Sequence, residues 1–343
     1  EETMKEETNI LLTSAGRRTY LVEYFKEAVA GKGRIHAANS QVCQAFSSAD
    51  QWVVTPLIYD KNYIPFLLEY CRNNNISILI SLFDIDLPVL AAHRKEFAEI
   101  GVDVIVSDEE MVAVCNDKWK TYQFLTENHL PAPQSFIKLE EAKQAVKEGR
   151  LSYPLMVKPR WGMGSLSVYE ADNEEELEVF YKKILREIGD SYLRFESSQA
   201  LEMCVLIQEK LDGQEYGLDI INDLNGCYQV TVPKRKAAMR SGETDAAETV
   251  DNEELRQLGQ QLGRLLHHRG NLDVDVFQAN GQYYILEMNA RFGGGYPFSH
   301  AAGIDLPRVL LSWEKGEQPK KEWLTARYGI RAQKAIKILV MEE

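Results

Sequence analysis

The sequence has few features that would tie it to a membrane, an oxidising compartment or nucleic acid. Its five cysteines are odd in number, scattered and never in a Cys-x-x-Cys pair, which favours reduced, buried thiols in a cytoplasmic protein. No apolar run approaches the roughly 18 residues of a membrane span, and the acidic start of the chain lacks the charge pattern of a signal peptide. A net charge of -13 argues against nucleic acid or an anionic membrane as the main partner.

Several signatures of common enzymes are missing too. The loop after the first predicted strand has one glycine, Gly16, where a dinucleotide-binding fingerprint needs three, which argues against a nicotinamide oxidoreductase. The Gly-Lys-Ser/Thr order of the common phosphate-binding loop is absent. There is also no Gly-x-Ser-x-Gly elbow and no convincing Cys/His pair, so we expect no covalent protein nucleophile.

What the chain does have is enough length for two or three domains, with 343 residues of which 45% are hydrophobic. The first 110 or so residues alternate between short apolar runs and amphipathic helices. The predicted strands are 9–13, 34–38, 76–82 and 102–106, and the predicted helices are 20–29, 63–72 and 87–100. This order predicts a parallel α/β sheet, with ligands beyond the ends of its strands.

Two loops of this region carry charged side chains whose roles the sequence leaves open. Ser14, Arg17 and Arg18 either face a substrate anion or form an ordinary solvated pair of arginines. Asp84 and Asp86 either recognise an amine or cap the helix that begins near residue 87.

A second region begins after Pro131, where a helix over residues 119–129 stops. A strand over residues 153–159 ends with Lys158, and a small glycine-rich turn follows, so an ammonium and free backbone N–H groups meet where phosphates could bind. An ordinary Gly-x-Gly turn between two strands is the alternative. Residues 174–188 read as a helix whose role is packing.

Two further segments each allow a functional and an ordinary interpretation. The strand over residues 204–209 runs into a polar turn, which is either a hinge that pairs with an adenine edge or a plain hairpin into the strand at 215–221. The basic runs at 233–236 and 239–244, which include Lys234 and Arg240, either flank a phosphate site or form a solvated face.

The stretch around which the chain is organised lies near its carboxyl end. The strands at 272–277 and 283–291 are joined by Asn280 and Gly281, a hairpin signal that should bring Asp275 and Glu287 together. Carboxylate and amide oxygens are ligands suited to magnesium holding a polyphosphate, which indicates nucleotide chemistry. Asn252 should cap a helix over residues 252–268, and Gly270 should end it. His267 and His268 should complement the dipole at the carboxyl end of this helix. A last strand is predicted at 335–341.

Taken in order, these motifs resemble an ATP-grasp protein of the carbamoyl-phosphate synthase-like group. The motifs that carry the resemblance are Asn116-Asp117-Lys118, Pro154 to Pro159 with Gly162-Met163-Gly164, Gln208 to Glu215, and Asp275 with Glu287 to Arg291. They span about residues 116–303, and the preceding α/β region resembles the domain that usually comes before this fold. The resemblance implies a pre-ATP-grasp α/β domain at 1–115, an ATP-grasp N-terminal subdomain with a glycine-loop lid at 116–205, and a C-terminal subdomain with the metal site at 206–343.

The resemblance also implies a role for each matching residue. Residues expected to bind ATP are Lys118, Lys158, Gly162, Gly164, Ser165, Glu209, Lys210, Leu211, Glu215, Lys234 and Arg240. Asp275, Glu287 and Asn289 match the metal ligands, although the family often has Glu where Asp275 stands, and Ala290 replaces a common proline. Arg291, with Lys158, matches the catalytic cations that face the transferred phosphoryl group.

We therefore expect an ATP-dependent carboxylate–amine ligase that forms an amide through an acyl-phosphate and releases ADP and phosphate. Its cofactors would be ATP and two Mg²⁺ ions, for which Mn²⁺ could substitute. Its partners would be a small carboxylate and an amine, with no nucleic acid or membrane and with a homodimer as a reasonable expectation. The alternatives are a carboxy-phosphate-forming enzyme and a module that binds ATP without turnover.

Overall fold

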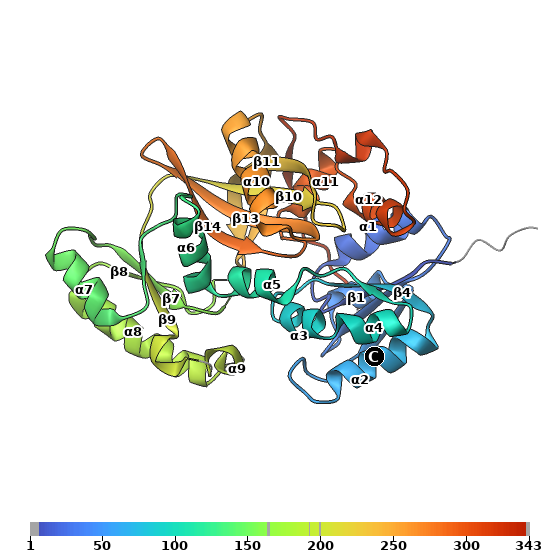
Figure 1. Ribbon diagram of the computed structural model, residues 1–343, viewed down its shortest axis with the longest axis horizontal. Helices are drawn as coiled ribbons and strands as arrows, with labels where there is room; N and C mark the ends of the chain where they lie inside the picture. Colours follow the sequence, from blue (N-terminus) through green and yellow to red (C-terminus); the bar gives the residue numbers. More distant parts are fainter. Residues whose placement is uncertain (1–6, 163–164, 192, 199, 341–343) are drawn as a thin grey trace, which may run out of the picture.

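The computed structural model describes residues 7–162, 165–191, 193–198 and 200–340, and in them the chain forms three sheets (Figure 1). The first sheet is five-stranded, in the order β3-β2-β1-β4-β5, and it is wholly parallel, as the sequence predicts, although β3 was not among the predicted strands. Its strands are β1 (Asn9–Thr13), β2 (Ile35–Asn39), β3 (Gln51–Val54), β4 (Ile76–Ser81) and β5 (Asp103–Val104). Its helices are α1 (Thr19–Val29), η1 (Gln44–Ser47), α2 (Tyr63–Asn73), α3 (Asp86–Ala92) and α4 (Arg94–Glu99). The single helix expected over residues 87–100 is wrong, because the chain breaks at His93 between α3 and α4.

Two short helices, α5 (Glu109–Asn116) and α6 (Lys118–Glu127), lead from this sheet to a small antiparallel one. Asp117 separates them, and its side chain accepts hydrogen bonds from the backbone N–H groups of Trp119 and Lys120 at the start of α6.

The second sheet has four antiparallel strands in the order β6-β9-β7-β8. Its strands are β6 (Ser135–Phe136), β7 (Leu155–Pro159), β8 (Tyr169–Ala171) and β9 (Val205–Glu209), with α7 (Leu139–Lys147), α8 (Glu174–Gly189), α9 (Arg194–Ser197) and η2 (Leu201–Met203). The predicted packing helix at 174–188 is confirmed as α8, which buries Leu177, Ile184 and Ile188.

The third sheet has six antiparallel strands in the order β14-β13-β10-β11-β12-β15. Its strands are β10 (Gln214–Asn222), β11 (Tyr228–Arg240), β12 (Glu243–Thr249), β13 (Gly270–Ala279), β14 (Gln282–Asn289) and β15 (Arg331–Gln333). Its helices are α10 (Glu253–Leu266), α11 (Tyr296–Ala301), α12 (Leu306–Glu314) and η3 (Lys321–Leu324).

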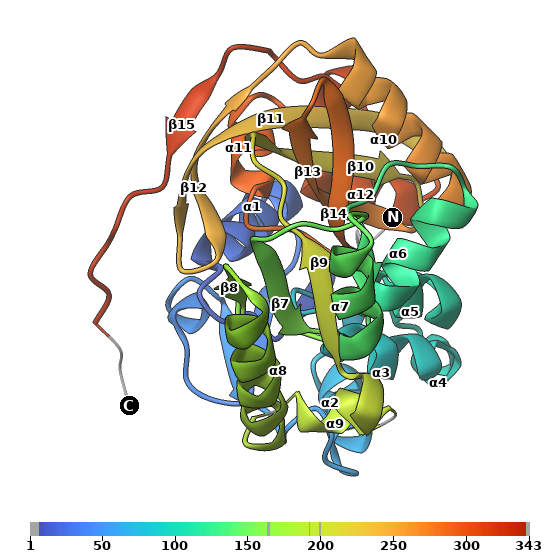
Figure 2. The ribbon, with the colours of Figure 1, turned by 90° about the vertical axis from the view of Figure 1, so that its left-hand side faces the viewer.

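Predictions for the ends of these elements had mixed success. The β13–β14 hairpin and the Asn252 cap of α10 are confirmed. The strand expected at 335–341 is wrong: β15 ends at Gln333, Lys334 still bonds to Asp245, and residues 335–340 continue as an extended tail (Figure 2), while 341 lies outside the described residues. Helix α10 ends at Leu266 with His267 in the left-handed region, so Gly270 begins β13 and does not end the helix.

The hydrophobic cores divide the molecule in a way that the element order does not show. Two cores each combine residues of the five-stranded and six-stranded sheets, for example Leu79 with Ile285 in one and Leu12 with Val232 in the other. The four-stranded sheet has a core of its own, built from residues 142–207. It therefore forms a separate lobe, at the left of Figure 1. Within the described residues, no helix combines the length and apolar character needed to cross a bilayer.

Candidate active site

The predicted metal ligands lie on facing positions of β13 and β14. Asp275 is the register partner of Glu287, and Asp273 is the partner of Asn289. Because residues two apart on a strand share a face, these four side chains point to the same side of the hairpin. Two carboxylates and an amide oxygen are a donor set that fits Mg²⁺. Among the described residues no three His, Cys, Asp or Glu side chains form a metal cluster, so such a site would need the Asn289 amide.

A lysine that the sequence analysis did not select reaches this face. The ammonium of Lys236 lies 2.6 Å from a carboxylate oxygen of Asp275 and 2.6 Å from one of Glu215. Lys236 stands on β11 and crosses β10 at Gly217, where a Cβ atom would lie 3.4 Å from the lysine Cε atom. Although burial opposes it, Asp275 and Glu215 raise the pKa of Lys236, so the lysine is a fixed cation. Burial raises the pKa of Asp275 to about 6, and Lys236 opposes that shift.

The two basic residues that were selected from this region point elsewhere. Lys234 is 1% exposed, and its ammonium is bound by Asp219 and Ser299. Arg240 pairs with Asp245 at 3.0 Å on the β11–β12 hairpin. The side chains of both residues are therefore engaged away from Glu287. Both lysines pass close to Gly217, and the alternation along residues 233–236 could not say which of them reaches Asp275.

Two lysines from different segments approach the carboxylate face. The ammonium of Lys118, at the start of α6, lies 3.9 Å from Glu287 and donates a hydrogen bond to the carbonyl of Gly162. That of Lys158, on β7, donates to Gln208 at 2.7 Å. Burial and the neighbouring Lys118 lower the pKa of Lys158 to about 8, which shows that its charge lacks a full complement of anionic partners.

An ion pair that the sequence analysis did not foresee positions Lys118. The Asp117 carboxylate accepts two hydrogen bonds of 2.8 Å from the guanidinium of Arg160, and both side chains are buried. The backbone N–H of Lys118 also donates to the carbonyl of Arg160. A bidentate pair of this kind restricts orientation as well as distance. It therefore holds the start of α6 against the chain that follows β7.

The glycine turn and the predicted adenine segment are described only in part. Gly164 lies outside the described residues, while Ser165 has a positive φ of 59°. Glu209 accepts a hydrogen bond from the backbone N–H of Gln134, and Lys210 pairs with Glu170. Leu211 lies in the connection between β9 and β10, which belong to different sheets, so the plain-hairpin interpretation is wrong.

Arg291 is held between two carboxylates. Its Nε and Nη2 atoms donate to one oxygen of Asp84 at 3.0 and 2.8 Å, and Nη1 donates to Asp273 at 3.1 Å. Although burial opposes it, Asp84 and Asp273 raise the pKa of Arg291. Asp86 does not cap α3, as the sequence analysis allowed, and makes no capping hydrogen bond. Its carboxylate instead accepts from the hydroxyls of four residues: Thr13, Ser14, Tyr63 and Ser81.

A small cavity lies where these segments meet. Its lining residues are Asp84, Cys115, Asn116, Lys118, Gly162, Glu196, Glu287 and Asn289. They come from all three sheets or their connections, so the cavity forms only in the folded chain. Glu196, from α9 of the small lobe, was not expected from the sequence, which offers no motif around it.

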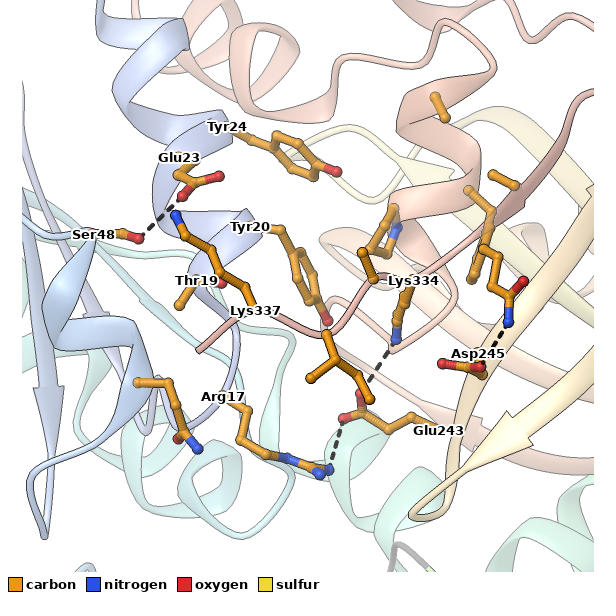
Figure 3. Close-up of a pocket in the computed structure, with 18 of the residues that line it drawn as sticks. Arg17, Thr19, Tyr20, Glu23, Tyr24, Ser48, Glu243, Asp245, Lys334 and Lys337 are labelled. Atoms are coloured by element: carbon orange, nitrogen blue, oxygen red, sulfur yellow. Dashed lines mark hydrogen bonds and ion pairs between the residues drawn. The ribbon is translucent and has the colours of Figure 1, made fainter. Parts of the chain in front are cut away.

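A much larger cleft, of about 1070 Å³, opens between α1 and the β12–β15 edge (Figure 3). Glu243 stands in it between Arg17 and Lys334, with the Tyr20 ring beside them. Arg18 pairs with Glu243 at 3.2 Å and also donates to the carbonyl of Phe292, so it is no solvated arginine. The cleft and the small cavity share no lining residue.

Comparison with protein families finds two matches. Residues 10–105 match the PylC-like N-terminal domain, and residues 115–295 match the ATP-grasp domain. Among curated relatives, the carbamoyl phosphate synthase large chain of Thermomicrobium roseum is 26% identical over 258 residues, which cover 70% of this chain and 22% of the relative. The arginine-specific large chain of Geobacillus stearothermophilus is 25% identical over 224 residues, 63% of this chain and 20% of the relative. The match thus spans about a fifth of each relative.

Solved structures with the same fold include both carboxylases and ligases. A biotin carboxylase from Campylobacter jejuni aligns with a TM-score of 0.71 and 15% identity over 95% of this chain and 75% of its own. An L-amino acid ligase from Bacillus licheniformis aligns with a TM-score of 0.70 and 19% identity over 95% of this chain and 79% of its own. At these identities the likeness establishes the fold alone.

Proposed function

Because the chain belongs to the ATP-grasp family, we propose that it is an ATP-dependent carboxylate–amine ligase. The observation that carries the proposal is the approach of Lys118 to Glu287 at 3.9 Å, in a cavity that Asn289 also lines. A cation able to bind phosphate and oxygen ligands able to bind magnesium thus meet at one point, although they come from segments about half the chain apart.

In this proposal the reaction joins two substrates in two displacements. An oxygen of the substrate carboxylate attacks the terminal phosphorus of ATP, and the bond from that phosphorus to the oxygen of ADP breaks. The nitrogen of the amine then attacks the acyl carbon, the bond from that carbon to the phosphate oxygen breaks, and the amine loses a proton as the amide forms. Phosphate and ADP are released.

The chain's own cations would hold the negative charge that these steps bring together. Lys118 and Lys158 would bind the phosphates of ATP, together with the turn at residues 162–165. Arg291 would face the transferred phosphoryl group. The segment 209–211 would line the adenine, and Glu215 would accept hydrogen bonds from the ribose. Lys236 pairs with both Glu215 and Asp275, so it would have to release at least one of them before both can act as proposed. Lys236 is therefore itself a residue of the site.

The proposed metal ligands are Asp275, Glu287 and Asn289. Magnesium bound there would supply positive charge that offsets the phosphates of ATP. The solved structure of a 2-oxoglutarate carboxylase domain that shares this fold, from Hydrogenobacter thermophilus, holds an ADP magnesium salt, which is consistent with this role. The proposed number of ions is two, and Mn²⁺ would be accepted in their place because it also favours oxygen ligands.

The separate core of the small lobe supports a closing motion. Residues 142–207 pack among themselves, so this lobe could swing about the connection at 210–213 without disturbing the other cores. Closure would exclude water, which would otherwise hydrolyse the acyl-phosphate. We propose that 1–115, 116–205 and 206–343 act as three domains, although β9, which ends at Glu209, would move with the small lobe.

The test is substrate-dependent ADP formation. The purified protein, ATP and magnesium would be supplied with pools of carboxylic acids, including amino acids, together with hydroxylamine, which converts an acyl-phosphate into a hydroxamate that can be measured. Hydroxamate that depends on one carboxylate pool is the expected result. If no pool raises ADP release above the background, the ligase proposal is wrong and a module that binds ATP without turnover is favoured.

The relatives favour a second candidate, a carboxy-phosphate-forming enzyme, since carbamoyl phosphate synthase large chains match most of this chain. Bicarbonate as the only carboxylate distinguishes the two. Rapid bicarbonate-dependent ADP release, with no response to organic acids, would support the second candidate.

A further inference from the structure

The small cavity carries more negative charge than its cations neutralise. Asp84, Glu196 and Glu287 line it beside the ammonium of Lys118, and because Glu287 is a proposed metal ligand, Asp84 and Glu196 are the carboxylates left for a further cation. Of the further cations nearby, Arg291 is shared between Asp84 and Asp273, and Lys158 interacts with Lys118 and Glu287. A cationic ligand in this cavity would therefore be favoured by the surrounding charge.

One oxygen of Asp84 lacks a partner. Asp84 is 4% exposed, and its Oδ2 atom accepts both hydrogen bonds from Arg291. Its Oδ1 atom is buried and has no hydrogen-bond partner among the described residues. A buried carboxylate oxygen in this state is costly unless a ligand or water donates to it. Asp84 is one of the lining residues of the cavity, which makes a ligand bound there the candidate partner for this oxygen.

Glu196 brings a second carboxylate from the small lobe. Its neighbour in the parallel domain is Tyr59, whose hydroxyl lies 3.4 Å from the Oε1 atom, so this carboxylate spans the gap between the two lobes. Burial raises the pKa of Glu196 to about 7, which shows that its negative charge is poorly compensated in the structure as it stands. The cavity has a free volume of about 10 Å³, which is about the space that one water-sized group needs.

We infer that Asp84 and Glu196 bind the ammonium group of the amine substrate beside Arg291. An ammonium has three N–H donors and no acceptor, which suits a small site that offers carboxylate oxygens. The inference rests on the proposed ligase function: Arg291 would hold the acyl-phosphate, and Asp84 contacts Arg291 directly, so the nitrogen would wait next to the carbon that it attacks. An ammonium has no lone pair, so it would first give a proton to one of the two carboxylates, and the neutral amine would then attack. The cation is either the ammonium ion or the head group of a primary amine, which have the same chemistry.

The test compares a charged acceptor with an uncharged one in the full-length chain. Hydroxylamine is mostly neutral near pH 7 and traps the acyl-phosphate without needing an ammonium site. In one arm ammonium chloride competes with hydroxylamine, and in the other a pool of primary amines, including amino acids, does so. The measurement is the amine concentration at which half of the acyl-phosphate forms the amide and half forms the hydroxamate. ADP release measures the total amount of acyl-phosphate formed.

The variant is Glu196→Gln, which keeps the size of the side chain and removes its charge. We expect it to raise that amine concentration about 10- to 100-fold, the range of a hydrogen bond to a charged group. The concentration is read from the ratio of amide to hydroxamate, so a change in the total rate does not enter it. Glu196→Asp should recover part of the loss. Glu202→Gln, an exposed carboxylate of the same lobe, is the matched control and should behave as wild type. The arm that responds identifies the source of the cation.

Three results would overturn the inference. Glu196→Gln could divert product at the same amine concentration as wild type, it could lose hydroxamate formation as well, or it could raise the magnesium requirement without any change toward amines. The last result would assign the carboxylate to a metal. Wild-type protein that makes no hydroxamate from any carboxylate contradicts the proposed function itself, and the inference falls with it.

Discussion

Asp84 and Asp86 stand two residues apart, after the same strand, and end in opposite environments. The region around Asp86 is closed: four hydroxyl groups donate to its two oxygens, and the residue is 0% exposed. The region around Asp84 and Glu287 is open: one oxygen of Asp84 has no partner, and Glu287 faces a cavity. Burial raises the pKa of Asp86, which its hydroxyl donors oppose.

The difference shows how to separate structural from functional carboxylates in this chain. A buried carboxylate whose oxygens all have donors holds the fold together and has no capacity left for a ligand. One whose oxygens lack donors is stable only if a ligand, a metal or water completes it. The hydrogen bonds therefore identify Asp84 as a site residue and Asp86 as a structural one. Glu287, which is partly exposed, is identified by its place in the cavity lining.

The largest expected effect lies on the open side. Glu287→Gln removes a proposed metal ligand, so ADP release should fall at least about 10³-fold, while the circular dichroism spectrum and unfolding midpoint stay close to wild type. The control is Glu254→Gln, which changes an exposed carboxylate of α10. A variant with the wild-type rate would mean that Glu287 is no metal ligand.

A change at Asp86 should lower the stability of the fold, whereas the change at Glu287 should lower activity. Asp86→Ala leaves three buried hydroxyls and the half-buried hydroxyl of Ser14 without their acceptor, and it should lower the free energy of unfolding by about 3 kcal/mol or more. Asp212→Ala, whose side chain is 87% exposed, should change it by less than about 0.5 kcal/mol. Denaturation by urea measures both. If Asp86→Ala unfolds like wild type, the hydroxyl cluster is not the structural centre that the geometry suggests.

The buried imidazole of His268 extends the comparison to a titratable group outside the ligand cavity. His268 is 0% exposed: its Nε2 atom donates to the carbonyl of Ile220, and Nδ1 has no partner among the described residues. Burial lowers the pKa of His268 to about 4 from an ordinary 6.5, so it is neutral at pH 7 and does not complement the helix dipole as a charge, contrary to the sequence analysis.

The unfolded chain therefore binds a proton at His268 below about pH 6.5, and the folded chain does not until about pH 4. The stability that this residue contributes is present above pH 6.5 and is lost as the pH falls through that window, by roughly 3 kcal/mol in total. Unfolding at pH 7.5 and pH 5.0 should show a smaller loss in His268→Gln than in wild type. Equal losses would show that His268 keeps an ordinary pKa in the folded state.

The smallest expected effect concerns the packing beside Arg291. A Cβ atom on Gly293 would lie 2.1 Å from the Cγ atom of Asp273, so Gly293→Ala must displace that carboxylate and loosen Arg291. We expect a loss of about 1–3 kcal/mol in unfolding free energy, with reduced ADP release. Gly189→Ala has no atom within 4 Å and should be neutral. Unchanged stability and activity in Gly293→Ala would show that the observed position of Asp273 is not required for the fold or for holding Arg291.

Local sequence patterns predicted most elements of the fold. The order of apolar runs and helices led to the parallel sheet, and Asn280 with Gly281 led to the hairpin that pairs Asp275 with Glu287. The errors came where a local pattern competes with tertiary packing. The apolar alternation after residue 334 resembles a strand, but in the described part of the carboxyl-terminal segment β15 ends at Gln333, and the alternation that follows does not join the sheet.

The sequence by itself determined the chemistry available to this protein: oxygen ligands on a tight hairpin, a lysine at a strand end and an arginine after Asn289. These follow from short-range rules, because strand alternation and turn residues act over a few positions. Only the tertiary structure decided which charges meet. The packing of the three sheets places Lys236, and not Lys234, beside Asp275. It also places Arg291 between Asp84 and Asp273, and it brings Glu196 in from another lobe. No local pattern encodes contacts between segments so far apart in the chain.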